Sequence, residues 1–244
     1  MTFRKSRFNF FFIWSSLFLL ITIIGFIPSF LLRPLFKETG IPSYFILHGA
    51  LMLLWFLGFF HQNFLIAKGK LINHKKNGIG WFILAFLVAL ANFNVLIRMS
   101  GEVIDGKESY YGVVRTVKNT GRLILGNLYL NLSSAILILI GYIKRKNPNV
   151  HKRALFGACV FLLAPALDRF MRPFNLEEFH PALNFIIFLF LIPISLIIYD
   201  LIRYRRLYLI SIIILLILIF IIPLITLGIE YQLDRSIIEF LGLR

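Results

Sequence analysis

Seven stretches of this chain are each long and apolar enough to cross a lipid bilayer, and together they fill most of its 244 residues. A membrane-spanning helix needs about 20 mostly apolar residues, because it rises about 1.5 Å per residue through about 30 Å of hydrocarbon. The predicted spans cover residues 9–32, 42–66, 79–98, 121–143, 153–172, 181–202 and 207–229. The sequence therefore predicts an all-α, polytopic transmembrane helix bundle that forms one integral membrane domain over residues 1–244.

The basic residues predict how this bundle is oriented. The chain carries 26 Lys and Arg against 11 Asp and Glu, but the basic residues cluster where predicted helices end, so the expected partner is the lipid bilayer and not nucleic acid. Fifteen of them lie on the side of the N-terminus, namely Arg4, Lys5, Arg7, Lys68, Lys70, Lys75, Lys76, Lys144, Arg145, Lys146, Lys152, Arg153, Arg203, Arg205 and Arg206. The positive-inside rule then predicts a cytoplasmic N-terminus and an external C-terminus. Abundant Ile, Phe, Leu and Lys with a single Cys indicates a bacterial inner membrane.

The second span carries a polar and aromatic face. His48, Met52, Trp55, Phe59 and Gln62 follow one another at spacings of four, three, four and three residues, which places them on one side of a helix. We expect this face to point into the bundle, because lipid disfavours its polar members. Two interpretations are open: the face binds a ligand or cofactor, or it packs through hydrogen bonds between helices.

Two histidines lie in basic segments on the predicted cytoplasmic side. His74 falls within the segment 69–76, and His151 opens the run His151-Lys152-Arg153 before the fifth span. Such segments bind anionic lipid headgroups and set topology. The alternative is that the two imidazoles are axial ligands of one haem, as bis-histidine ligation leaves the iron for electron transfer. His48 is a further candidate ligand.

A second group of polar residues lies in the outer halves of the third, fourth and fifth spans. Intramembrane polar residues are candidates for function, so these side chains could line an outward-facing cavity. Alternatively, the arginines extend to the outer headgroups. The candidate lining residues are Asn94, Arg98, Asn127, Asn131, Asp168 and Arg169.

The segments outside the spans offer little room for other chemistry. The connection 99–120 is predicted as an external loop with an aromatic pair, Tyr110 and Tyr111, and residues 230–244 as a short interfacial helix. The chain has no phosphate-binding glycine loop, zinc-binding histidine pair or hydrolase elbow. We therefore expect a protein without a catalytic role.

One set of motifs resembles known membrane proteins. The pattern His48-Gly49 with Met52, Trp55 and Gln62, followed by His74 and the His-Lys-Arg run, resembles an uncharacterised group of bacterial multi-pass membrane proteins. More distantly it is similar to cytochrome b561-type electron carriers, which bind haem b through histidines on several helices. That resemblance implies a haem held by His74 and His151.

Three functional classes follow from the sequence. The first is a protein that binds a lipid or small molecule, or assists a membrane complex. The second is a haem-b-binding electron-transfer protein. The third is a small-molecule transporter that uses the outer polar residues, with Pro165 as the hinge.

Overall fold

The computed structural model describes residues 9–35, 40–107, 114–171 and 181–242, with side chains described outside 181–189. This part of the chain is helical and has no β-strand. Two short turns, η1 (Ile27–Leu31) and η2 (Arg33–Leu35), follow the first helix. The helices are α1 (Phe10–Phe26), α2 (Ser43–Ala67), α3 (Leu71–Ile104), α4 (Val117–Ile143), α5 (Pro148–Met171), α6 (Pro181–Tyr204), α7 (Leu209–Glu230) and α8 (Leu233–Gly242).

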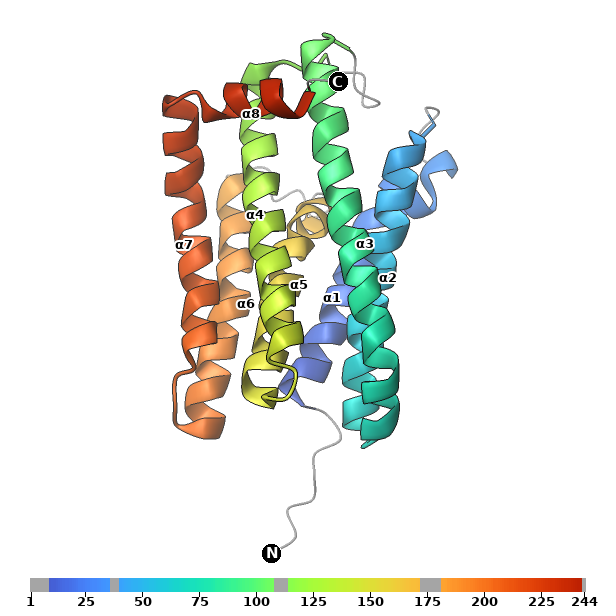
Figure 1. Ribbon diagram of the computed structural model, residues 1–244, viewed down its shortest axis with the longest axis vertical. Coiled ribbons are helices and arrows are strands. Elements are labelled where there is room, and N and C mark those ends of the chain that lie inside the picture. The colour runs from blue at the N-terminus through green and yellow to red at the C-terminus, as the bar shows by residue number, and fades with distance from the viewer. Residues whose placement is uncertain (1–8, 36–39, 108–113, 172–180, 243–244) are drawn as a thin grey trace, which may run out of the picture.

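Helices α1 to α7 run up and down along the long axis of the molecule, and α8 lies across one end of them (Figure 1). The turns α2–α3, α4–α5 and α6–α7 meet at the opposite end, which we call the basic end because it carries residues 68–76, 144–153 and 203–206. Within the described residues, six helices are long and apolar enough to cross a membrane: α1 with η1, α2, α3, α4, α5 and α7. These findings confirm a helical, multi-pass membrane protein. A seventh span in α6 stays a prediction.

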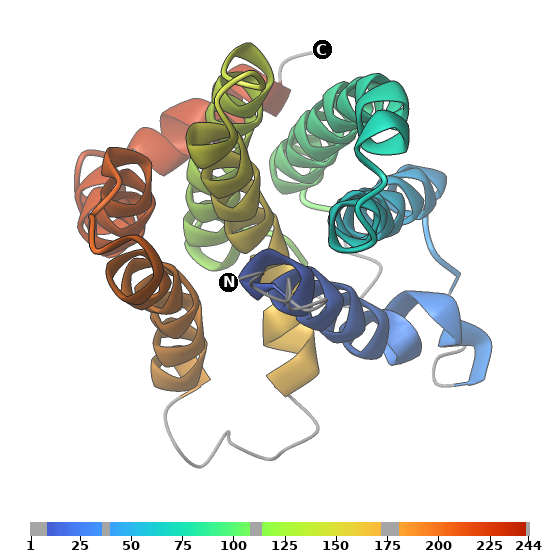
Figure 2. The same ribbon diagram turned by 90° about the horizontal axis from the view of Figure 1, so that it is seen from below.

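Helix α5 is the centre of the bundle. Of its most apolar window, 72% is buried inside the protein, compared with 17–33% in the other five spans. Viewed from the basic end, α1, α4 and α6 surround it (Figure 2). Small residues such as Ala154, Gly157 and Ala158 allow neighbouring helices to approach closely, and their positions are buried.

Two helices begin earlier than hydropathy predicts. Helix α3 starts at Leu71 and not near residue 79, and α5 starts at Pro148 and not near residue 153. The prediction that His74 and His151 lie in segments before these helices is therefore wrong, since both lie in their first turns. Hydropathy marks where a helix leaves the lipid, whereas hydrogen bonding lets it continue through polar residues. The α2–α3 turn is tight because Gly69 adopts a positive φ of 73°.

The far end of the bundle also differs from the prediction. Helix α3 extends to Ile104, so the connection to α4 is shorter than 99–120, and Tyr110 and Tyr111 lie outside the described residues. The predicted helix after residue 230 is present as α8, which packs across α3 and α4. Its Ile238 is buried, whereas Phe240 is 76% exposed. This pattern gives α8 one side against the bundle and another toward the surroundings.

Candidate functional site

The polar and aromatic face of α2 points into the bundle, as its spacing predicts. Met52, Trp55 and Phe59 are buried, whereas Ile46 and Leu47 on the other side are about half exposed. Two polar atoms on the inward face, Nδ1 of His48 and Nε1 of Trp55, are buried without a hydrogen-bond partner among the described residues. His48 lies far from the basic end, so the structure does not bring it to His74 and His151.

At the basic end, His74 of α3 and His151 of α5 lie side by side. Their ring centroids are 6.3 Å apart and their planes are inclined by 81°, and we call these two residues the histidine pair. The Nδ1 atom of His151 lies 2.8 Å from the carbonyl oxygen of Gly141 in the last turn of α4. A ring held in this way by its Nδ1–H keeps Nε2 for a ligand, which is the usual arrangement of metal-binding histidines.

Gln62 of α2 holds the other histidine. With its amide assigned from the surrounding hydrogen bonds, its nitrogen donates to the His74 carbonyl oxygen at 3.1 Å and to Nδ1 at 2.5 Å. Its oxygen accepts from Nε1 of Trp81 at 3.0 Å. In this orientation Nδ1 of His74 accepts the bond, which places the ring proton on Nε2. Both rings of the pair are thus fixed through Nδ1.

Aromatic side chains lie beside the histidine pair, and a glycine one turn along α3 faces open space. The Phe82 ring lies 6.3 Å from that of His151 and 5.0 Å from that of Tyr142. One turn along α3 from His74, a Cβ added to Gly78 would meet no atom within 4 Å. No cluster of three or more His, Cys, Asp or Glu that could hold a metal ion occurs in the described part of the chain. The described residues at this site therefore offer the imidazoles of His74 and His151 and no third ligand of these types.

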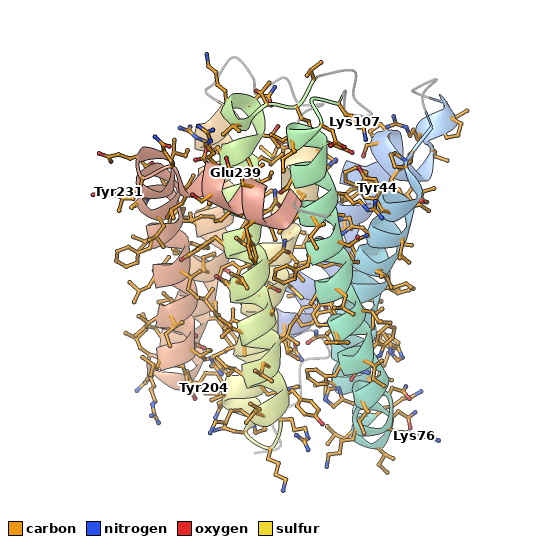
Figure 3. The ribbon with its side chains drawn as sticks, turned by 45° about the horizontal axis from the view of Figure 1, so that its top comes forward. Tyr44, Lys76, Lys107, Tyr204, Tyr231 and Glu239 are labelled. Carbon is orange, nitrogen blue, oxygen red and sulfur yellow. The ribbon has the colours of Figure 1, made fainter. Side chains whose placement is uncertain are left out.

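An ion pair next to this site was missed by the sequence analysis. Arg153 and Asp200 are fully buried and bonded to each other, and Ser211 donates to Asp200 at 2.6 Å. The Arg153 guanidinium also lies 3.6 Å from the centroid of the Tyr208 ring. Near it, Lys152 donates to the hydroxyl of Tyr204, which Figure 3 shows at the basic end. This network joins α5 to α6 and α7, so Arg153 has a structural partner.

The predicted outer residues do not gather around one described pocket. Asn131 accepts a hydrogen bond of 2.7 Å from Asn92, a buried residue that was not among the candidates. Asn127 donates to the carbonyl of Leu123 in its own helix. The remaining candidates divide by exposure: Arg98 and Asp168 are exposed, and Asn94 and Arg169 are half-buried.

Arg169 has partners close to α1. It donates to the carbonyl oxygen of Pro165 at 2.8 Å, and its guanidinium lies 4.8 Å from the Phe26 ring centroid. A second polar contact in this half joins Tyr44, Glu102 and Arg115: the Tyr44 hydroxyl donates to Glu102 at 2.6 Å, and Arg115 pairs with the same carboxylate at 2.5 Å. These contacts tie helices and loops together, and the cavity proposed for the outer residues stays a prediction.

No family model, curated protein or solved structure matches the chain. The resemblance to b561-type carriers therefore stays a prediction, and the function is argued from the geometry of the site.

Proposed function

We propose that the histidine pair holds one haem b between His74 and His151 in a transmembrane electron-transfer protein. The observation that supports this is the separation of 6.3 Å between the two ring centroids. A metal ion bound by two imidazole nitrogens on opposite sides, at about 2 Å each, separates the ring centroids by about 6 Å. Two imidazoles at this separation would be able to hold one haem iron between them.

The surrounding residues fit a haem better than a bare metal ion. A structural zinc site needs four protein ligands, whereas haem iron takes four nitrogens from the porphyrin and needs two. Gly78 leaves space beside His74, and Phe82 and Tyr142 provide apolar and aromatic surface. Lys75 and Arg145, at the same end, supply positive charge for the propionates.

The chain's own residues would set the ligation and its environment. A bound haem supplies reversible one-electron exchange at its iron. The Gly141 carbonyl would fix the His151 imidazole and the Gln62 amide that of His74, whose Nε2 would have to give up its proton before it could hold the iron. An electron carrier of this kind transforms no substrate, which agrees with the expectation of a protein without a catalytic role.

We further propose seven spans, with α6 as the sixth, in a bacterial inner membrane. The basic end would then face the cytoplasm, together with the N-terminus, and α8 would lie at the external surface. The concentration of Lys and Arg at the three turns of the basic end supports this orientation.

The deciding experiment is a reduced-minus-oxidised absorbance spectrum of the full-length protein, purified in mild detergent from haem-sufficient cells. We expect a Soret shift with sharp visible bands, and loss of these bands in His74→Ala and in His151→Ala. His61→Ala is the matched control, because His61 lies near the same end but outside the pair, and it should keep the spectrum. A colourless protein that is folded and monodisperse would overturn the haem proposal.

A further inference from the structure

A groove opens between α2 and α3 near the basic end. It has a volume of about 480 Å³ and is open to the surroundings. Its lining residues are Leu54, His61, Lys76, Asn77, Gly80, Trp81 and Leu84.

The lining is ordered from charged to apolar along the helix axis. Lys76 lies at the basic end, as Figure 3 shows, and Asn77 follows it. Leu84 comes eight residues after Lys76 in α3, which at about 1.5 Å per residue places it about 12 Å further along the helix. Leu54 of α2 also lines the groove. A membrane lipid has the same order, with a polar headgroup above apolar chains.

One wall of the groove is the imidazole of His61. Its Nδ1 atom is buried away from open space, so contact with an occupant of the groove falls to the other atoms of the ring. The His61 ring lies 5.9 Å from the ring of Trp81, a residue type common at the level of lipid headgroups. Across the groove, a Cβ added to Gly80 would meet no atom within 4 Å, so this glycine keeps the groove open.

Charge at this end favours an anionic occupant. Lys68, Lys70 and Lys75 are exposed beside Lys76, and the sequence has no Asp or Glu between Glu38 and Glu102. Basic pockets between transmembrane helices bind the headgroups of anionic lipids.

We propose that the α2–α3 groove binds one anionic phospholipid. Lys76, Asn77 and His61 contact its phosphate, and Leu54 and Leu84 contact an acyl chain. The proposal stands apart from the haem, since it uses none of the atoms of the histidine pair. It connects to that site through Trp81, which lines the groove and donates to Gln62.

The test is thermal unfolding of the delipidated full-length protein in detergent, with added phosphatidylglycerol or phosphatidylcholine. A ligand that binds only the folded state raises the Tm, and we expect phosphatidylglycerol near 100 times its Kd to raise it by about 5 °C. Phosphatidylcholine should raise it much less. Lys76→Gln should reduce the shift by weakening the headgroup contact, and Gly80→Leu should abolish it by filling the groove.

Matched controls separate the groove from the general surface. Lys146→Gln removes a lysine at the same end but outside the groove, and Ile79→Phe adds bulk on an exposed face of α3; both should keep the full shift. Equal shifts with the two lipids would overturn the proposal, as would an equal shift with inorganic phosphate or a larger one with a quinone. Native mass spectrometry of co-purified lipid provides a second measurement for Lys76→Gln if Gly80→Leu does not fold.

Discussion

Arg153 and Asp200 form a bidentate ion pair that is fully buried between α5 and α6. Nε of Arg153 donates to both carboxylate oxygens, at 3.1 and 2.9 Å, and a second guanidinium nitrogen donates to the same carboxylate. Ser211 of α7 completes the contacts of Asp200, and the Asn149 carbonyl accepts a further bond from Arg153. Both charges are therefore neutralised and hydrogen-bonded by groups of the protein itself.

This pair predicts an asymmetry between single and double substitutions. Asp200→Leu or Arg153→Met alone should lower the free energy of unfolding by about 3–5 kcal/mol, because each leaves a buried charge without its partner. The double variant should recover much of this loss. Thermal unfolding in detergent measures the effect, and Glu239→Gln is the control, since its exposed pair with Arg235 should contribute less than about 1 kcal/mol. Additive losses in the double variant would contradict the prediction.

The Asn92–Asn131 hydrogen bond should couple α3 to α4. We expect a double-mutant cycle of Asn92→Ala and Asn131→Ala to give a coupling energy of at least about 0.6 kcal/mol, the average for such bonds in membranes, and at most about 1.7 kcal/mol. Unfolding in a denaturing detergent titration measures it. Asn127→Ala should show no coupling to Asn92→Ala, because Asn127 bonds within its own helix.

The attachment of α8 to the bundle should depend on the side chain of Ile238. Ile238 is 1% exposed and packs among Val95, Leu96, Met99 and Ile124, so Ile238→Ala should cost about 2–4 kcal/mol and loosen α8. Hydrogen exchange in residues 233–242 should rise in this variant. Phe240→Ala, at an exposed position of the same helix, should leave the exchange unchanged. Equal hydrogen exchange in the two variants would mean that residues other than Ile238 attach α8 to the bundle.

Gly58 should be needed for the contact between Trp81 and Gln62. A Cβ added at Gly58 would overlap the Trp81 ring, so the larger side chain of Gly58→Leu would displace the indole. We expect a loss of about 1–3 kcal/mol from overpacking, measured by thermal unfolding, together with a change in tryptophan fluorescence. Gly80→Ala, where the added methyl group meets open space, should change neither quantity.

The orientation of the chain can be tested at its end. A phosphatase reporter that is active only outside the cytoplasm, fused after Arg244, should be active if seven helices span the membrane with the N-terminus inside. A reporter active only in the cytoplasm should be inactive at the same position. The reverse result would mean an even number of spans or the opposite orientation.

Much of the fold could be predicted because hydropathy reports directly on lipid contact. The face of α2 was also predictable, because residues three and four apart share a side of any helix. Helix starts such as Leu71 and Pro148 were not, because polar residues beyond the lipid continue a helix as readily as they form a loop. The position of His74 and His151 within first turns follows from this difference.

Contacts between distant helices were the harder part of the site. The residues around Arg153 in the sequence do not indicate that it pairs with Asp200. An arginine within a basic run is typical of a segment that sets membrane orientation, so only the structure identifies its partner. Asn131 was a candidate, but its partner Asn92 could be identified only once α3 and α4 were placed together. The distance between the rings of His74 and His151 likewise depends on how α3 and α5 are placed relative to each other. The spacing of residues within one helix does not determine this placement.

The histidine pair joins the start of α3 to the start of α5, and its rings are held by α2 and α4. During synthesis α2 and α3 are made before α5, so His74 can meet Gln62 but has no second imidazole beside it until α5 has been made. The site is thus completed late, and a nascent chain halted before α5 cannot form it. Binding of a cofactor that needs both imidazoles would therefore show that α5 has taken its place in the bundle.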